Sequence, residues 1–297
     1  MKKGLVYGAG LLLLCAVAGW ADDHYVSPAG TNNSPYTNWA DASTNIQAAV
    51  NVTLAGEPVG VTNGTYTLTN QINILTNITL QSVNGTNFTF INGNFPQTIN
   101  RCVYMTNGVL DGFTISNGFA SGGSGGGILI SNAGSVLNSV IYRNYCSNDA
   151  GTVSGGGGIF LYLPNTTASI VSNCAIVSNI VYIGTNAGSS IGGGIRSRRG
   201  TIVASYIAGN RAYNSGGIFL DYTLITNCMV TDNLATNRGG GSLSFVSMVN
   251  CVISNNVASG NATGIGDIGG IWCYASIMCD SIIIKAPPQN QWAMNRA

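Results

Sequence analysis

Residues 216–233 read GGIFLDYTLITNCMVTDN, and residues 240–256 read GGSLSFVSMVNCVISNN. Both stretches contain a glycine pair, an Asn-Cys dipeptide followed by apolar residues, and a closing asparagine. The closing asparagines, Asn233 and Asn256, lie 23 residues apart. A repeat of about 20 to 30 residues, made of short apolar runs and turn residues, has the length of one solenoid coil. The sequence therefore predicts an all-β fold of stacked coils.

Six copies of this unit align over residues 109–258. We expect a column of small residues and a column of mostly β-branched residues to face a narrow core. A third column contains only asparagine, which predicts a hydrogen-bonded ladder at a left-handed turn. Glycine pairs follow each copy and predict close backbone approach and positive φ at the next corner. The columns are Gly112, Ser139, Cys174, Ser205, Cys228 and Cys251; Thr114, Ile141, Ile176, Ile207, Val230 and Ile253; and Asn117, Asn144, Asn179, Asn210, Asn233 and Asn256.

Charged residues make up 7% of the 297-residue chain, and 41 residues are glycine. Because ordinary soluble domains contain about 25% charged residues, Asn, Ser, Thr and Gly must cover much of this surface. The formal net charge is +1, which argues against an electrostatic nucleic-acid partner.

The N-terminus has the composition of a secretion signal. Lys2 and Lys3 precede an apolar stretch at 5–17, and small residues permit cleavage after Ala18 or Ala21. The apolar stretch is too short for a comfortable transmembrane span, and no second one follows. We expect a signal peptide at residues 1–21, a secreted or cell-surface protein, and no transmembrane anchor in the mature chain.

Seven cysteines remain after this segment, and an odd number argues against a complete disulfide framework. Cys228 and Cys251 occupy one column in adjacent coils, where in-register side chains seldom reach disulfide torsions, so buried thiols are favoured. No Cys/His cluster has metal-ligand spacing. We expect no metal and no cofactor.

Ile46, Ala49 and Val50 follow the i, i+3, i+4 pattern of a short amphipathic helix, predicted over residues 43–52. The opening from His24 through this helix to Tyr66 resembles the start of exported bacterial right-handed parallel β-helix proteins of the pectin-lyase-like class. The resemblance implies that the helix caps the N-terminal end, where an uncapped coil would expose unpaired backbone and apolar core. We expect a cap region at 22–58, a right-handed parallel β-helix at 59–285 and a tail at 286–297.

The Gly-Gly-Ile and Ile/Val-x-x-Asn pattern also resembles the repeats of chlamydial-type polymorphic outer-membrane proteins, over about residues 109–284. Ile or Val stands here where those repeats have Phe. This resemblance implies a surface-exposed passenger.

Pectin-lyase-like folds often contain polysaccharide lyases and glycoside hydrolases, which need clustered or paired carboxylates. The acidic residues beyond the cap fall in different columns of the repeat, so the sequence predicts no catalytic constellation. They are Asp111, Asp149, Asp221, Asp232, Asp267 and Asp280. A lyase or hydrolase stays an alternative.

Alternation along the strand after each glycine corner predicts an outward face rich in aromatic and arginine side chains. We expect this face to be a sugar-stacking or protein-contacting platform, unless a loop or the tail covers it. Its candidate ligand-binding residues are Phe160, Tyr162, Arg196, Arg198, Phe219, Phe245, Trp272 and Tyr274, and Leu243 is expected to point outward among them. Arg198 and Asp221 fall at the same position of successive coils, which predicts a surface ion pair.

These features favour a secreted or cell-surface binding or adhesion module, with a polysaccharide or cell-surface glycan as first ligand class. We expect a monomer. The alternatives are a lyase or hydrolase, and a structural scaffold or truncated surface protein.

Overall fold

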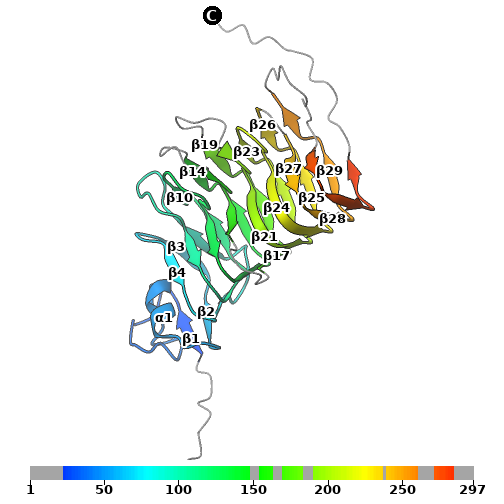
Figure 1. The fold of residues 1–297 in the computed structure, drawn as a ribbon. Coiled ribbons are helices and arrows are strands. Elements are labelled where there is room, and N and C mark those ends of the chain that lie inside the picture. The colour runs from blue at the N-terminus through cyan, green and yellow to red at the C-terminus, as the bar shows by residue number, and fades with distance from the viewer. Residues whose placement is uncertain are drawn as a thin grey trace, which may run out of the picture.

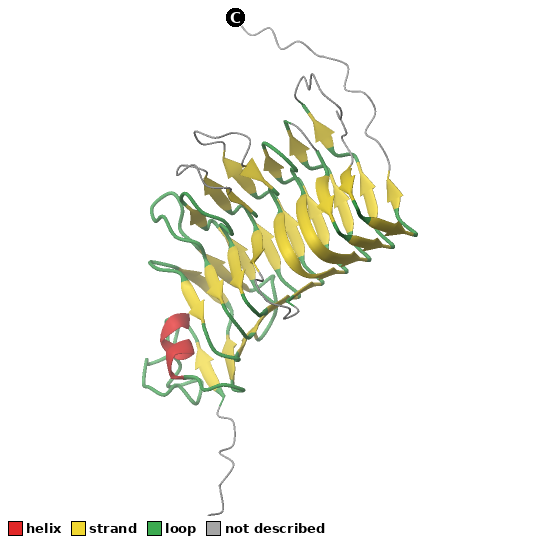
Figure 2. Ribbon diagram, in the orientation of Figure 1, coloured by secondary structure: helices red, strands yellow, loops and turns green. Residues whose placement is uncertain are grey.

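The chain forms a right-handed parallel β-helix capped at its N-terminal end by a short helix (Figure 1). A computed structural model describes residues 23–147, 154–162, 169–182, 190–236, 239–259 and 271–283. In Figure 2 the single helix lies at one end of a long stack of strands. The fold class and the capping helix are therefore those predicted from the repeat and its opening. The signal peptide predicted at residues 1–21 and the tail predicted at 286–297 lie outside the described residues.

The strands stack in parallel, in register, in sheets that run along the solenoid axis. The 16-stranded sheet holds two stacks, joined where β21 (Ile195–Val203) and β24 (Ile218–Thr226) run through both. The first stack also contains β4 (Ile72–Ile74), β7 (Val103–Met105), β11 (Ile128–Ser131), β16 (Ile159–Tyr162), β27 (Gly241–Ser244) and β31 (Ile271–Tyr274). The second contains β1 (His24–Val26), β2 (Pro58–Val61), β5 (Thr79–Ser82), β8 (Val109–Asp111), β12 (Ser135–Leu137), β17 (Ile170–Ser172), β28 (Ser247–Val249) and β32 (Ile277–Cys279).

Two further sheets complete the coil, and a short strand pair lies beside them. The nine-stranded sheet contains β3 (Gly64–Thr67), β6 (Thr89–Asn92), β9 (Thr114–Ser116), β13 (Val140–Tyr142), β18 (Ala175–Val177), β22 (Tyr206–Ala208), β25 (Met229–Thr231), β29 (Val252–Ser254) and β33 (Ile282–Ile283). The six-stranded sheet contains β10 (Phe119–Ala120), β14 (Tyr145–Ser147), β19 (Ile180–Tyr182), β23 (Arg211–Ala212), β26 (Leu234–Ala235) and β30 (Val257–Ala258). The pair is β15 (Ser154–Gly155) and β20 (Ser190–Ile191).

The helix α1 (Ile46–Val52) closes the N-terminal end, as predicted, but begins later than residue 43. It buries Ile46, Ala49 and Val50, and the Asn45 side chain caps it by accepting the Ala48 amide. The described residues contain no helix long and apolar enough to cross a membrane.

A buried hydrogen bond between His24 and Glu57 joins β1 to the loop after the helix. His24 Nε2 lies 3.2 Å from Glu57 Oε2, and His24 Nδ1 lies 2.7 Å from the Pro35 carbonyl. Both ring nitrogens thus face acceptors, which fixes β1 at the start of the stack.

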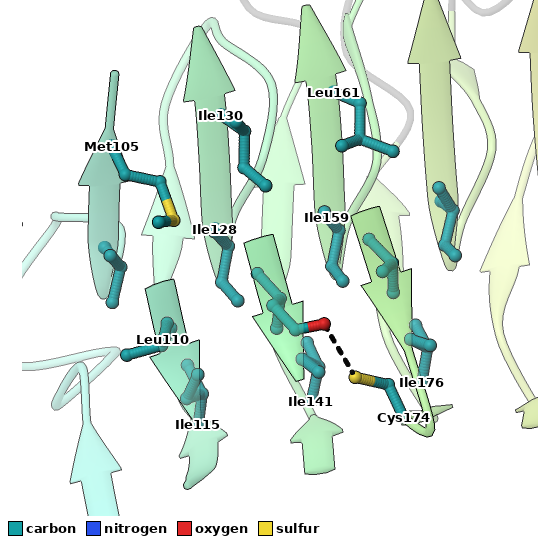
Figure 3. Packing of buried hydrophobic residues seen from close by; sticks show 14 of the residues in the cluster. Met105, Leu110, Ile115, Ile128, Ile130, Ile141, Ile159, Leu161, Cys174 and Ile176 are labelled. Carbon is teal, nitrogen blue, oxygen red and sulfur yellow. Dashed lines mark hydrogen bonds between the residues drawn. The ribbon is translucent and has the colours of Figure 1, made fainter. Parts of the chain in front are cut away.

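The core is a continuous column of apolar side chains inside the coil. Ile128, Ile159 and Ile195 pair in register and are fully buried, and a second row runs through Ile141, Ile176 and Ile207. Figure 3 shows these rows facing one another across the narrow interior. Like residues therefore stack on like, and only similar volumes fit each column.

The predicted asparagine ladder is present and buried. Asn179 Oδ1 accepts the Asn144 backbone N–H at 2.9 Å and Asn144 Nδ2 at 3.1 Å, while Asn179 Nδ2 donates to the Ile141 carbonyl at 2.9 Å. The same three bonds recur at each later rung, made by Asn210, Asn233 and Asn256. Each buried amide is therefore satisfied along the solenoid axis.

The small-residue column forms a second ladder, which volume alone does not explain. The Cys174 N–H donates to Ser205 Oγ at 3.2 Å, and the Ser205 N–H donates to Cys228 Sγ at 3.4 Å. Cys251 N–H likewise donates to Ser281 Oγ at 3.2 Å. From Ser139 onward these positions hold Ser or Cys, side chains that are both small and able to accept a hydrogen bond.

The first copy begins one residue later than the sequence alignment places it. Ile115, not Thr114, pairs with Ile141, so Phe113 and Gly118 take the places assigned to Gly112 and Asn117. Asn117 occupies the left-handed turn (φ 53°) and donates to Asn92. In every coil this left-handed residue precedes the ladder position: Arg143, Ser178, Gly209, Asp232 and Asn255. The ladder asparagines themselves have negative φ, contrary to expectation.

The glycine pairs are required by the ladder. A Cβ on Gly217 would lie 2.8 Å from Asn233 Nδ2 and 2.7 Å from the Gly240 carbonyl. Gly158 and Gly194 meet Asn179 and Asn210 in the same way. Close approach is thus confirmed, whereas positive φ falls three residues before the buried isoleucine of the next strand: on Gly125, Gly156 and Gly192, and on Ser215 ahead of the pair at 216–217.

We predict that Asn210→Ala lowers the free energy of unfolding by about 2–4 kcal/mol, because two Asn179 donors lose their acceptor. Asn84→Ala is the control, since the exposed Asn84 side chain bonds only to exposed Asn63. Its effect should stay within about 0.5 kcal/mol. Denaturant unfolding measures both variants. Equal denaturation midpoints for the two variants would contradict a stabilising contribution from the asparagine ladder.

The seven described cysteines are free thiols, and only Cys273 and Cys279 are exposed. Burial raises the pKa of Cys102, Cys146 and Cys174 to about 12. We predict that a thiol reagent at pH 8 modifies two of these seven thiols rapidly in the folded protein, and the other five only after denaturation. Counting released chromophore in the native and denatured protein checks this, and a third fast-reacting thiol would contradict it.

Candidate functional site

The outward face of the first stack carries most of the predicted site residues. One column of this face runs in register through Tyr104, Leu129, Phe160, Arg196, Phe219, Ser242 and Trp272. The next outward column runs through Ser131, Tyr162, Arg198, Asp221, Ser244 and Tyr274. Seven of the eight predicted residues therefore occupy these two columns, as alternation along the strands requires.

Phe245 belongs to a different column, and Leu243 points inward. Gly241 pairs with Ile218 and Ser242 with Phe219, so the strand after residues 239–241 is shifted by one position from its predicted frame. Leu243 is consequently fully buried. Phe245 lies in the following turn with φ 53°, at the position that Arg199 and Tyr222 occupy in the preceding coils.

We call the surface formed by these columns the aromatic face, and its side chains contact one another from coil to coil. The Arg196 guanidinium carbon lies 4.6 Å from the Phe160 ring centre, and that of Arg198 lies 5.8 Å from the Tyr162 ring. Such cation–π contacts hold both arginines along the solenoid axis. The face comprises Phe160, Tyr162, Arg196, Arg198, Phe219, Tyr222, Phe245, Trp272 and Tyr274.

A second group of contacts lies nearer the C-terminal end. The Tyr222 and Phe245 rings stack at 4.8 Å with 5° between their planes, and the Phe245 ring meets the edge of Tyr274 at 5.5 Å. Tyr274 in turn lies 6.3 Å from Trp272. Tyr222 was not predicted, because sequence alternation says nothing of the turn that follows the strand.

The rings differ in their access to a ligand. Tyr162, Tyr222, Phe245 and Tyr274 are 39%, 57%, 45% and 56% exposed, whereas Phe160 is 9% exposed beneath Arg196. The accessible part of the aromatic face is thus its tyrosines and Phe245, while Phe160 supports a guanidinium.

Asp221 lies beside Arg198 in the adjacent coil, as predicted, but the two side chains form no direct ion pair. Burial raises the pKa of the Asp221 carboxyl above its ordinary value, and the positive charges of Arg198 and Arg196 partly offset this rise. The result is a partly buried carboxylate on the aromatic face.

We predict that the Asp221 carboxyl titrates above an ordinary aspartate, and that Arg198→Gln raises its pKa further. The sign follows because the Arg198 charge favours the ionised form and its removal favours the protonated form. Carbon NMR of the labelled carboxyl across the acid range measures both values. A lower pKa in the variant would contradict this account.

The acidic residues of the described repeat lie on different elements of the fold. No group of three or more His, Cys, Asp or Glu there is placed to hold a metal ion. Asp111, Asp221 and Asp232 lie on β8, on β24 and in the turn after β25, respectively. Asp149 and Asp267 lie outside the described residues.

Two features near this face escaped the sequence prediction. A stacked series of rings covers the six-stranded sheet, with Phe95 and Phe119 at 4.5 Å and Tyr145 and Tyr182 at 5.6 Å. The other is Arg101, which precedes Tyr104 at the N-terminal end of the first outward column. Arg101 lies before the aligned repeat, where no fixed spacing identified outward positions. Phe119, Tyr145 and Tyr182 lie within the repeat, but after the asparagine column, where the sequence analysis assigned no outward strand positions.

The architecture defines the class of protein, a right-handed parallel β-helix. Among solved structures the chain is similar to the pectate lyase Pel9A, with 17% identity, a TM-score of 0.51, and coverage of 93% of this chain and 81% of that chain. Two structures of the pectin methylesterase from Aspergillus niger have TM-scores of 0.41 and 0.42 at 13% and 12% identity, over 92% of this chain and 88% of theirs. No protein-family model and no curated protein matches the chain. At these identities the likeness shows the fold alone.

Proposed function

We propose that this chain is a carbohydrate-binding β-helix module, exported to the cell surface or beyond, that holds a glycan along its aromatic face. The observation that carries the proposal is the set of partly exposed rings at Tyr162, Tyr222, Phe245 and Tyr274 on one side of the solenoid. A contiguous exposed aromatic surface usually marks an interaction site. Sugar rings have an apolar face that packs on an aromatic ring, while their hydroxyls hydrogen-bond to nearby polar side chains.

The polar groups of the face support a sugar rather than an apolar partner. Arg198, Asp221 and Ser244 lie in the same outward column as Tyr162 and Tyr274. They place donors and acceptors between the rings, at the spacing of one coil. An extended chain of hydroxyl-bearing units fits such a surface better than a flat apolar one does.

We predict that Tyr162→Ala and Tyr274→Ala each weaken glycan binding by about two- to tenfold, the loss expected from one aromatic contact of about 0.5–1.5 kcal/mol. Tyr206→Ala is the matched control, because Tyr206 is a 42% exposed strand tyrosine on the nine-stranded sheet. A glycan array selects the ligand, and calorimetry with that glycan gives the affinities. Equal losses in all three variants, or binding that none of them affects, would overturn the assignment to the aromatic face.

The Asp221 carboxyl favours one alternative, a lyase or hydrolase that uses it as a proton donor or acceptor. Its raised pKa and its place among the rings suit such a role. Reducing-sugar release from the bound glycan tests this alternative directly. Turnover that Asp221→Asn abolishes, with binding unchanged, would replace the binding-module proposal by an enzyme.

A further inference from the structure

The N-terminal coils contain a cavity of about 540 Å³ at the corner between the first stack and the six-stranded sheet. Its lining includes four side-chain amides, one cation and one ring: Asn70, Gln71, Asn73, Asn100, Arg101 and Phe119. Asn70 and Gln71 also line a second cavity of about 540 Å³, which borders α1. The two cavities therefore share part of their walls.

Among the described residues that line the corner cavity, Arg101 is the only charged one, and no described side chain pairs with its guanidinium. It makes no hydrogen bond and no ion pair with the described residues, and burial lowers its pKa. The groups that oppose this lowering are the Tyr104 phenol and the Cys146 thiol, and burial raises the pKa of the Cys146 thiol to about 12, so that it supplies no counter-charge at neutral pH. A partly desolvated cation without a counter-charge is costly unless an anion completes it.

The amides around Arg101 are held in defined orientations. Gln71 Nε2 donates to Asn73 Oδ1 at 2.8 Å. The Asn73 backbone N–H donates to Gln47 Oε1 at 2.6 Å, which holds the Asn73 backbone in place. Asn73 Oδ1 is therefore occupied as an acceptor, and its amide nitrogen is the side-chain group that can donate to a ligand. Phe119 is held by stacking on Phe95.

This cavity lies at the end of the aromatic face. Asn73 pairs with Tyr104, Tyr104 with Leu129, and Leu129 with Phe160. A ligand that follows the first outward column toward the N-terminus therefore reaches the amides and Arg101.

We propose that the corner cavity binds an oxyanion, a carboxylate or a sulfate ester, carried by a sugar unit of the ligand. The planar Arg101 fork matches either group with two parallel hydrogen bonds, and the Asn73 amide supplies a third donor. The remaining amides suit the hydroxyls of the same sugar. The proposal rests on the proposed function for the sugar, whereas the oxyanion follows from Arg101 itself.

The test compares Arg101→Gln with Arg143→Gln, whose arginine is exposed on the nine-stranded sheet and lies over the Tyr142 ring. Sodium glucuronate, sodium sulfate and glucose are the small probes, followed by a carboxylated, a sulfated and a neutral oligosaccharide. Calorimetry at low salt measures affinity, and circular dichroism verifies folding. Arg101→Lys retains the charge and is expected to keep part of the affinity.

We expect one acidic probe class to bind the wild type and Arg143→Gln alike, and to lose at least tenfold in affinity for Arg101→Gln. Neutral ligand binding should not change. Preference for glucuronate or for sulfate identifies the oxyanion. Undiminished acidic binding in Arg101→Gln, or no acidic probe binding the wild type, overturns the cavity proposal.

A different set of results is expected if the glycan-binding function proposed for the aromatic face is wrong. In that case no oligosaccharide binds and Tyr162→Ala has no effect, while glucuronate or sulfate still binds in a manner that depends on Arg101. The two proposals can therefore fail independently.

Discussion

The rest of this structure depends on one kind of hydrogen bond. In it, the residue that follows a left-handed turn residue donates its backbone N–H to a side chain of the next coil. Asn144 N–H follows Arg143 and bonds to Asn179, while Cys174 N–H follows Asn173 and bonds to Ser205. A buried amide without an acceptor costs about 1–3 kcal/mol, and the turn repeats in every coil. The interior must therefore hold asparagine, serine and cysteine at fixed positions. The glycine pairs follow in turn, because a Cβ there would displace the asparagine amide.

This constraint separates the residues that build the solenoid from those free to act. The inward columns and turns are fixed by the two ladders and by a core that stacks like on like. Outward positions of the first stack take no part in the ladders or the core, and several of them hold tyrosine, phenylalanine or arginine. Both proposals use only outward or corner side chains. The ladder and core residues on which folding depends have no part in either proposed binding site.

The sequence predicted the architecture because a 23-residue repeat, an asparagine at a constant offset and a short amphipathic segment each have one physical explanation. The sequence prediction was wrong where one residue type suits two different structural positions. Asn117 suits a left-handed turn as well as a ladder rung, so the first copy was aligned one residue early. Three consecutive glycines at 239–241 allowed two frames, and Leu243 was assigned to the wrong face. The shorter spacing from Gly240 to Asn256 than from Gly216 to Asn233 was the available signal. No signal in the sequence marked Arg101, because its lack of a partner among the described residues is seen only in the folded chain.

The bonds that the asparagine oxygens accept all point one way along the axis. Each coil donates its ladder backbone N–H to the coil that follows it and receives a side-chain oxygen from that coil. The two sides of a rung are therefore chemically unlike: it offers its side-chain oxygen to the coil before it and its backbone N–H to the coil after it. The solenoid is a directional polymer, in which any coil added at the C-terminal end must bring an asparagine oxygen, and any coil added at the N-terminal end must bring a backbone N–H. A grafted or duplicated repeat thus has a single orientation in which it can join the stack.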